Sequence, residues 1–102
     1  MSQAKYEPGI HTGLDPGTIA ARLRQDRWDP MPISDEAGYV YPPHSHATTK
    51  LLAIIEGSIE VSVAGTMYRC QSGDQVVVPG EVEHSAIVGR DGCTFFWSEQ
   101  LR

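Results

Sequence analysis

Residues 38–57 have the sequence GYVYPPHSHATTKLLAIIEG. Two histidines, His44 and His46, stand two residues apart in it, ahead of the apolar run Leu51 to Ile55. Residues two apart on a strand project from the same face, so both imidazoles can point into one cavity. His84 begins another apolar run and can close a third side of that cavity. Three neutral imidazoles that face one point are suitable ligands for Zn²⁺, Fe²⁺, Ni²⁺, Cu²⁺ or Mn²⁺.

The chain around this stretch alternates short apolar runs with glycine-bearing turns. Ser58 to Val63 alternates apolar and polar residues, which indicates a half-buried strand, and Ala64-Gly65 is a hairpin signal. Seven or eight short antiparallel strands joined by such turns predict an all-β jelly-roll barrel. The other expected strands are residues 39–41, 50–55, 66–70, 75–78, 84–88 and 93–97, with 29–33 restricted to a sheet edge by its prolines. Turns are expected at residues 35–38, 56–57, 71–74, 80–83 and 89–92.

The segment ahead of the barrel contains the one helix that the sequence indicates. Asp15 suits an N-cap, a proline follows it at the first helical position, and Ile19 and Leu23 form an apolar stripe. We expect this short helix to pack on the outside or the mouth of the barrel. Residues 1–13 are expected to be an N-terminal arm, and residues 14–102 a single domain.

Two stretches of the chain resemble the two motifs of the cupin superfamily. In residues 38–57 a glycine is followed after five residues by His-x-His, then by the position of a glutamate ligand, and after six more residues by a second glycine. Residues 73–88, GDQVVVPGEVEHSAIV, have the spacing of the second motif, which ends with the third histidine and a terminal asparagine position. The 15 residues between them, 58–72, are near the minimum for the family. The resemblance implies a small single-domain cupin, a double-stranded β-helix barrel, with one divalent transition metal bound by His44, His46 and His84.

The chain departs from the family pattern at three positions. Lys50 stands where the first motif has its glutamate ligand. Glu81 stands in the glycine position of the second motif, with Gly80 displaced by one, so that turn is expected to be slightly rebuilt. Val88 stands in the asparagine position, which is a change in packing.

Lys50 determines the charge of the predicted site. Strand parity puts it on the same face as His44 and His46, if the intervening residues add no bulge. An ammonium about 6 Å from a dication, at an effective dielectric of about 20, repels it by about 5 kcal/mol. Four outcomes are open: Lys50 turns outward and pairs with an acid, is neutral, holds an anionic ligand against the metal, or leaves the site without metal. A three-histidine site keeps the full charge of a dication and therefore favours anionic oxygen ligands.

Composition limits the classes of partner. The chain has 102 residues, a net charge of −5 and eight scattered basic residues, so no nucleic-acid surface is indicated. It has no signal-peptide pattern and no apolar run near the ~20 residues of a membrane span. We expect a cytoplasmic protein in which Cys70 and Cys93 are free thiols. The apolar run Leu51 to Ile55 offers both faces for burial, which a barrel of this size does not cover unaided, so we expect a homodimer.

Two functions fit these observations. The first is a metal-dependent enzyme, an oxygenase or an isomerase or lyase, that acts on a small anionic metabolite, with Lys50 or a glutamate near His84 moving protons. The second is a non-catalytic cupin that binds or senses a small ligand or a metal, and a purely structural barrel is a third option. The resemblance adds that three-histidine cupin centres occur in some thiol and diketone dioxygenases. An inward-facing acid or base besides the histidines distinguishes the first function from the second, and Lys50 is the candidate.

Other residues are assigned smaller roles. Glu81 and Glu83 flank His84 and are alternative partners or bases for the site. His11, in the arm, is not expected to be a metal ligand. The aromatic side chains that can line the pocket, or instead pack in the core or in a dimer, are Tyr39, Tyr41, Phe95, Phe96 and Trp97.

Overall fold

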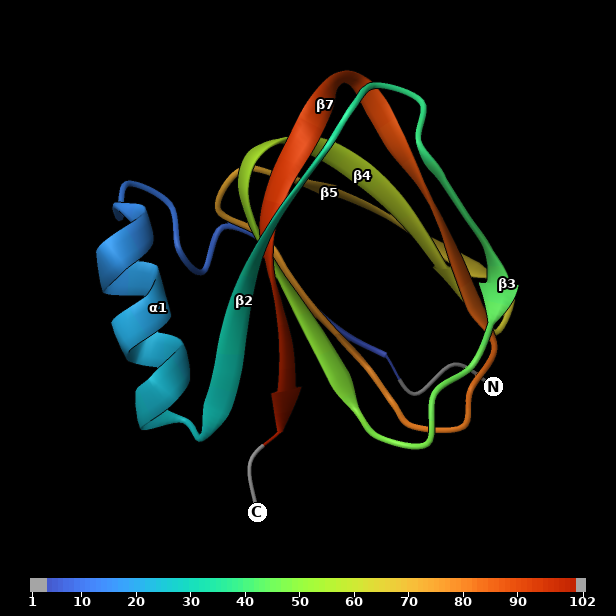
Figure 1. Ribbon diagram of the computed structural model, residues 1–102, viewed down its shortest axis with the longest axis horizontal. Coiled ribbons are helices and arrows are strands. Elements are labelled where there is room, and N and C mark those ends of the chain that lie inside the picture. The colour runs from blue at the N-terminus through green and yellow to red at the C-terminus, as the bar shows by residue number, and fades with distance from the viewer. Residues whose placement is uncertain (1–3, 101–102) are drawn as a thin grey trace.

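Two long strands form the framework of the barrel. In the computed structural model, which describes residues 4–100, β4 runs from Lys50 to Val63 and β7 from His84 to Gln100 (Figure 1). They pair antiparallel along nearly their whole length, from Lys50 opposite Glu99 to Val63 opposite His84. Both strands bend on the way around the barrel (Figure 1), and their two halves have different neighbours within one seven-stranded sheet.

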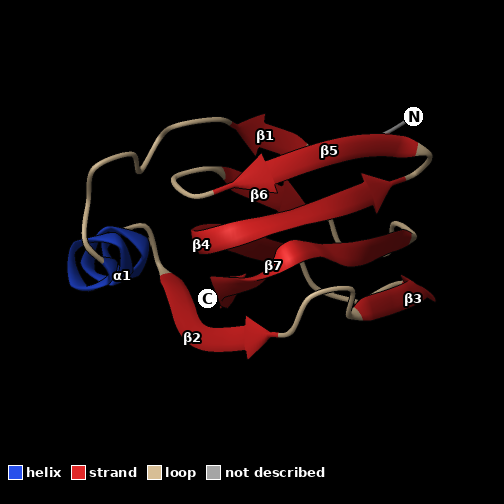
Figure 2. Cartoon of the chain, turned by 90° about the horizontal axis from the view of Figure 1, so that it is seen from above, coloured by secondary structure: helices blue, strands red, loops and turns tan. Residues whose placement is uncertain are grey.

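The shorter strands extend each half of this central pair. On one half the strand order is β1-β6-β4-β7-β2, and on the other half β5 pairs with β4 while β3 pairs with β7 (Figure 2). Every one of these pairings is antiparallel, so the predicted all-β jelly roll is confirmed. The shorter strands are β1 (Lys5–Glu7), β2 (Trp28–Asp35), β3 (Val40–His44), β5 (Thr66–Gln71) and β6 (Gln75–Val78).

Two of the predicted turns are wrong, because the strands continue through them. Residues 56–57 lie within β4, and residues 89–92 lie within β7. The β4–β7 register shifts at this point, and Gly57 has a φ of +78°. A Cβ on Gly57 would lie 2.0 Å from the Gly92 carbonyl oxygen, so the two backbones touch where the barrel bends. Glycine serves here as a bend with close backbone approach, not as a chain reversal.

The predicted hairpin between β4 and β5 is confirmed. Ala64 and Gly65 both have positive φ, 48° and 87°, as the two-residue turn with the twist of the flanking strands requires. Residues 29–33 lie in β2, which ends the strand order and is therefore the predicted edge strand.

The predicted helix is present and covers the outside of the barrel. It is α1, Pro16–Gln25, and the Asp15 carboxylate caps it by accepting a hydrogen bond from Thr18 N at 2.7 Å. Figure 1 shows it beside β2. Its buried residues pack in an outer apolar cluster that consists of Ile19, Ala20, Leu23, Trp28, Leu51, Ala53 and Phe96.

The outer cluster buries the face of β4 on which the expectation of a homodimer was based. Leu51 and Ala53 are 1% and 0% exposed within a single chain, because α1 covers the face of β4 that was expected to need a second copy. A dimer is therefore not required to bury that strand. Among residues 4–100 no helix is long and apolar enough to cross a membrane.

The N-terminal arm is joined to the barrel by strand pairing and by polar contacts. β1 pairs with β6, and the Tyr6 hydroxyl donates to Asp74 at 3.1 Å. His11 is 4% exposed, and its Nε2 lies 2.7 Å from Gln75 Oε1.

Candidate metal centre

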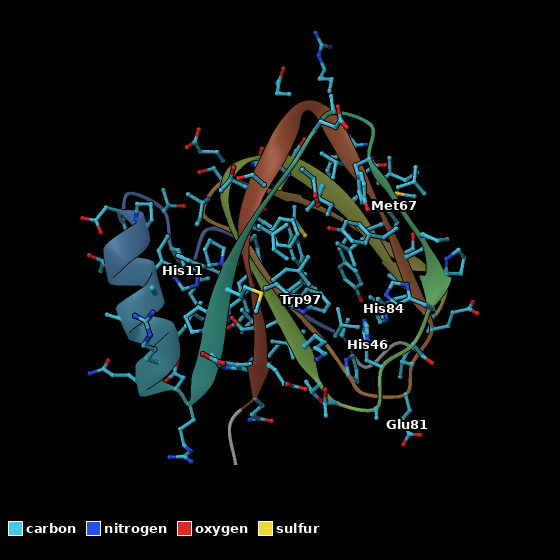
Figure 3. All side chains as sticks on the ribbon, viewed as in Figure 1. His11, His46, Met67, Glu81, His84 and Trp97 are labelled. Carbon is cyan, nitrogen blue, oxygen red and sulfur yellow. The ribbon has the colours of Figure 1, made fainter. Side chains whose placement is uncertain are left out.

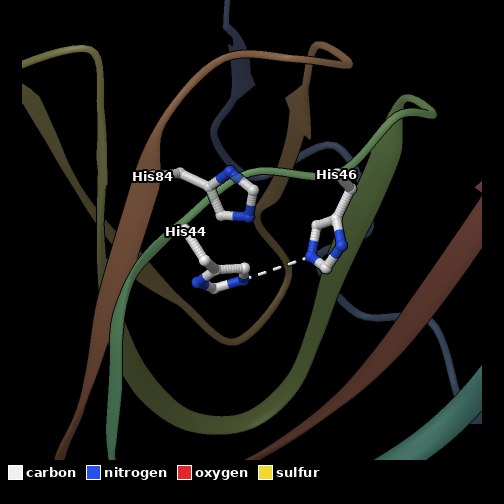
Figure 4. A group of neighbouring side chains, drawn as sticks. All are labelled: His44, His46 and His84. Atoms are coloured by element: carbon white, nitrogen blue, oxygen red, sulfur yellow. Dashed lines mark hydrogen bonds between the residues drawn. The ribbon is translucent and has the colours of Figure 1, made fainter.

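The three predicted histidines come from two strand ends and one loop. His44 is the last residue of β3 and lies opposite His84, the first residue of β7. His46 lies beyond the end of β3, so the expectation that one strand carries both histidines of the first motif is wrong. The three rings nevertheless converge (Figure 4), and their centroids are 4.4, 4.8 and 5.1 Å apart.

Backbone carbonyls determine which ring nitrogens face the centre. Pro42 O lies 2.6 Å from His44 Nδ1, and Val82 O lies 3.0 Å from His84 Nδ1. A carbonyl only accepts, so each of these two Nδ1 atoms carries the proton, and the Nε2 atoms of His44 and His84 turn their lone pairs toward the centre. Such a second contact orients the ring of a metal-binding histidine and fixes its tautomer. His84 Nε2 is buried and has no hydrogen-bond partner among the described residues.

The donor set fits a divalent transition metal. One ligand atom from each histidine lies within 4.8 Å of the others. His44 Nε2 and His46 Nε2 are 3.1 Å apart, close to the ~3.4 Å between two ligands bound ~2.1 Å from a tetrahedral zinc ion. A lone pair that is buried without a donor is costly, and a metal ion would remove that cost at His84 Nε2. These residues could therefore hold a metal ion.

Burial and nearby charged or ionisable groups favour the neutral form of His46. The pKa of His46 is lowered, first by burial and then by the nearby His44, His84 and Lys50, while Glu99 opposes the shift. Burial acts this way because it disfavours the charged imidazolium. A metal binds the neutral form of histidine, so the shift favours metal binding near neutral pH.

The loop that contains His46 is held by the turn before β7. Glu81 N donates to His46 O at 2.6 Å. A Cβ on Gly80 would lie 2.7 Å from Ala47 O, so only glycine lets the two segments approach this closely. Glu81 itself has a φ of +63°, which is the unusual conformation that a glycine adopts without strain. The turn therefore holds the Glu81 backbone in a strained conformation. The Glu81 side chain is exposed and points away from the histidines (Figure 3).

Lys50 has the acidic partner of the first predicted outcome, but its side chain does not turn outward. Its Nζ lies 3.0 Å from Glu99 Oε1, so it pairs with an acid. It does not turn out to solvent, because its side chain is only 12% exposed and it has the strand parity of Leu52, which faces the inner core. Nζ lies 5.8 Å from the centre of the Trp97 ring, and that ring lies 5.6 Å from His46. The carboxylate of Glu99 offsets the repulsion between this ammonium and a metal ion.

The histidines lie at one end of a cavity inside the barrel. The cavity has a volume of about 320 Å³ and is lined by three of the aromatic residues considered above, Tyr41, Phe95 and Trp97. His46, His84 and Trp97 are directed into the interior in Figure 3. Tyr39 is 46% exposed, and Phe96 belongs to the outer cluster. The Tyr41 hydroxyl donates to Asp35 at 2.5 Å, and burial together with this bond raises the pKa of Tyr41, so the phenol stays protonated.

Several contributors to the site were not found from the sequence. Glu81 and Glu83, the carboxylates nearest to His84 in sequence, are exposed, whereas the carboxylate beside the site is Glu99. Thr48 donates to that same carboxylate at 2.7 Å. The only signal for Glu99 was its position two residues after Trp97 and four after Phe95, which places all three on one face of a strand.

Comparison with known proteins identifies the family. Residues 32–100, more than half of the chain, match the family described as the AraC-like ligand binding domain. The chain belongs to this family and is a cupin. The match covers the barrel from β2 to the end of β7 and includes all three histidines.

Individual relatives of this cupin are distant. Over 58 residues, which are 57% of this chain, it is 29% identical to the dimethylsulfoniopropionate lyase DddW of Ruegeria pomeroyi. The chain spans only 38% of the length of that relative. Among solved structures, an RmlC-like cupin from Shewanella frigidimarina has a TM-score of 0.66 and 22% identity over 74% of this chain and 68% of its own. KdgF from Halomonas sp. has a TM-score of 0.64 and 23% identity over 74% and 71% of the two chains. At these identities the solved structures show a common fold alone.

Proposed function

We propose that this cupin binds one divalent transition metal through His44, His46 and His84 and is a metal-dependent enzyme for a small anionic metabolite. The observation that supports this most strongly is the buried Nε2 of His84, which has no hydrogen-bond partner within residues 4–100 and lies beside two further imidazoles of suitable spacing. A bound metal would supply Lewis acidity toward an oxygen atom of the substrate. Iron, nickel, zinc, copper and manganese all suit three imidazoles.

The residues around the histidines would assist in different ways. The apolar walls of the cavity would exclude water from the substrate, which strengthens electrostatic contacts inside. The Tyr41 phenol, held by Asp35, would offer an oxygen fixed in position at the cavity wall. Lys50 is our proposed catalytic residue, since its nearly buried ammonium lies beside Trp97 and near His46.

The reaction class we favour is that of a lyase or isomerase, with an oxygenase as the alternative. DddW, the curated relative, is named a lyase, and the likeness to it extends over 57% of this chain. Lewis-acid chemistry on a bound oxygen is sufficient for such a reaction and needs no redox change at the metal.

Turnover by defined metal forms tests the proposal. Untagged protein loaded with Fe²⁺, Ni²⁺, Zn²⁺ or Mn²⁺ is incubated with a panel of small carboxylates, and substrate loss is followed by NMR with and without oxygen. We expect loss of one substrate with the metal-loaded protein and none with His84→Ala. Oxygen consumption in step with substrate loss would identify an oxygenase. Full metal occupancy without turnover of any compound would contradict the enzyme and favour the second function.

That second function is a non-catalytic ligand-binding or sensing module. It is favoured by one specific observation, the membership in a family described as ligand-binding domains. In this case the cavity would hold a ligand without changing it, and the metal would serve as part of the binding site.

We further propose that the protein is a cytoplasmic homodimer. Buried free thiols at Cys70 and Cys93 are typical of a reducing compartment. Large apolar side chains stay exposed on the barrel, among them Met31, Val40, Met67 and Ile87 at 51–60% exposure, and Val40 and Ile87 are direct neighbours on β3 and β7. A second copy would cover such residues. A monomeric sedimentation coefficient at micromolar concentration would exclude this dimer.

A further inference from the structure

The interior of the barrel and its mouth differ sharply in chemistry. Apart from the histidines, the polar groups on the cavity wall are those of Tyr41, Ser85 and the Trp97 indole, and Tyr41 is already bonded to Asp35. The rest of the lining is hydrocarbon, including Ile33, Leu52, Ile59, Val61, Val78 and Phe95. No aspartate, glutamate, lysine or arginine among the described residues lines it. A charged or many-hydroxyl group placed in this interior would lose its water and gain few partners.

The charged groups of this region lie at the start of β4 and the end of β7. Lys50 and Glu99 are direct cross-strand neighbours, with Nζ and Oε1 3.0 Å apart. Thr48 donates to the same Oε1 at 2.7 Å, so the carboxylate is held from two sides. The side chain of Glu99 is 53% exposed, whereas that of Lys50 is only 12% exposed. Of the two charges, the positive one is therefore on the inner side.

The ammonium of Lys50 retains unused hydrogen-bond donors. It carries three N–H groups, and Glu99 is the one acceptor that it meets among residues 4–100. Trp97, one of the cavity residues, has Lys50 Nζ 5.8 Å and the His46 ring centre 5.6 Å from the centre of its own ring. A largely desolvated ammonium attracts an anion more strongly than an exposed one does, because water no longer screens it.

We propose that Lys50 is the specificity-determining residue of this cupin and that its ligands are amphipathic monocarboxylic acids. The carboxylate lies at the mouth of the barrel against Lys50 and the three histidines, and the uncharged, apolar remainder fills the interior. Glu99 and Thr48 are positioning residues that hold the ammonium in place. The inference rests on the proposed function in taking the barrel cavity as the substrate site, and it narrows the substrate from any small anion to this class.

Two other kinds of ligand, dicarboxylates and neutral alcohols, should bind this site more weakly. A dicarboxylate of the same length would place its second charge among hydrocarbon side chains. A neutral alcohol of the same length would fit the interior but would leave Lys50 without its anion. The discriminating features are thus one negative charge at one end and no charge at the other.

Calorimetric titration with three six-carbon probes tests this directly. Hexanoate, adipate and 1-hexanol are titrated into untagged wild-type protein, both metal-free and loaded with Zn²⁺, and into Lys50→Met and Lys50→Arg. Lys5→Met is the matched control, because the Lys5 side chain is 72% exposed on β1 and pairs with Glu7, far from Lys50 in sequence. Bound zinc is measured on every sample.

We expect wild type and Lys5→Met to bind hexanoate at least tenfold more tightly than adipate. Lys50→Met should bind hexanoate at least tenfold more weakly and 1-hexanol as wild type does, which also shows that its cavity is intact. Lys50→Arg, which keeps the charge, should stay within about threefold of wild type. Equal hexanoate affinity in wild type and Lys50→Met, adipate affinity equal to that of hexanoate, or no hexanoate binding to wild type would each overturn the proposal.

The two proposals fail in different ways in this experiment. Zinc bound at one per chain without a preference for hexanoate would contradict the ligand class and leave the metal centre standing. Hexanoate binding that depends on Lys50 in a protein that takes up no metal would contradict the metal centre and leave the ligand class standing.

Discussion

Two buried histidine sites in this cupin look alike singly and differ in what surrounds them. His11 in the N-terminal arm and His84 at the start of β7 are 4% and 7% exposed, and each has one buried ring nitrogen without a partner. His11 Nε2 lies 2.7 Å from Gln75 Oε1, and Gln75 in turn donates to Glu7, so this histidine belongs to a polar network that joins the arm to β6. His84 instead has its Nδ1 on a backbone carbonyl and its Nε2 near two more imidazoles.

The difference shows what makes a buried histidine a candidate metal ligand. Burial and an unpartnered nitrogen are common to both sites, so neither is sufficient. Convergence of three imidazoles is found only at His44, His46 and His84 among the described residues, and a backbone carbonyl fixes the tautomer of two of them, His44 and His84. Substitution of a histidine in the group of three should therefore change metal affinity, whereas substitution of His11 should change stability alone.

The largest expected effect is the loss of metal on removing one imidazole of the triad. Replacing His84 by alanine leaves two ligands, and we expect Zn²⁺ affinity to fall at least about 1,000-fold. His11→Ala should leave it within twofold of wild type. Calorimetric titration of untagged proteins measures both, and similar losses in the two variants would remove the distinction between the sites.

Next in size is the effect of crowding the contact between the two loops of the metal centre. Gly80→Ala places a Cβ 2.7 Å from Ala47 O, which pushes the His46 loop away from the turn before β7. We expect metal affinity to fall about 10- to 100-fold, as for other groups that orient ligands. Gly13→Ala is the control in the arm. Its φ is +81°, but apart from its chain neighbours no atom of the described residues lies within 4 Å of its Cβ. Equal Zn²⁺ affinity in both variants would show that the close contact at Gly80 does not affect metal binding.

A smaller and purely structural effect is expected at the arm. His11→Ala leaves the buried Gln75 side chain without one partner, which costs about 2 kcal/mol of the free energy of unfolding. Urea denaturation of metal-free protein measures this. An unchanged unfolding midpoint would show that the arm network contributes nothing, and a fall in zinc occupancy would show that it is coupled to the metal centre.

The smallest expected effect is a gain in stability at Glu81. This residue has a φ of +63° and an exposed side chain, so Glu81→Gly relieves strain by about 1 kcal/mol without removing the N–H bond to His46 O. The same denaturation experiment should show a higher midpoint, with zinc affinity within threefold of wild type. A lower midpoint would mean that the side chain has a stabilising role.

The comparison also shows which features sequence could reveal. The spacing of His44, His46 and His84 and the alternation in 58–63 are local patterns. They predicted the barrel, and the structure places these three histidines together. The turns expected at 56–57 and 89–92 failed because a glycine in a reversal and a glycine in a bent strand look the same locally. The contact of Gly57 with Gly92, distant in sequence, decides between them.

Long-range register accounts for the remaining differences. Glu99 became the partner of Lys50 only through the pairing of β4 with β7, across 49 residues of chain. The cover of Leu51 and Ala53 by α1 likewise depends on where the helix packs, which its own sequence does not specify. Nothing in the residues around His11 indicated that it would be buried, because its partners lie on β6.

The metal content of the untagged protein tests the central claim most directly. Wild type and His44→Ala are purified without an affinity tag, exposed to excess Fe²⁺, Ni²⁺ or Zn²⁺, desalted and subjected to elemental analysis. We expect close to one transition metal per wild-type chain and none in the variant. No bound metal in wild type with any of the three ions, or equal amounts in wild type and variant, would contradict it.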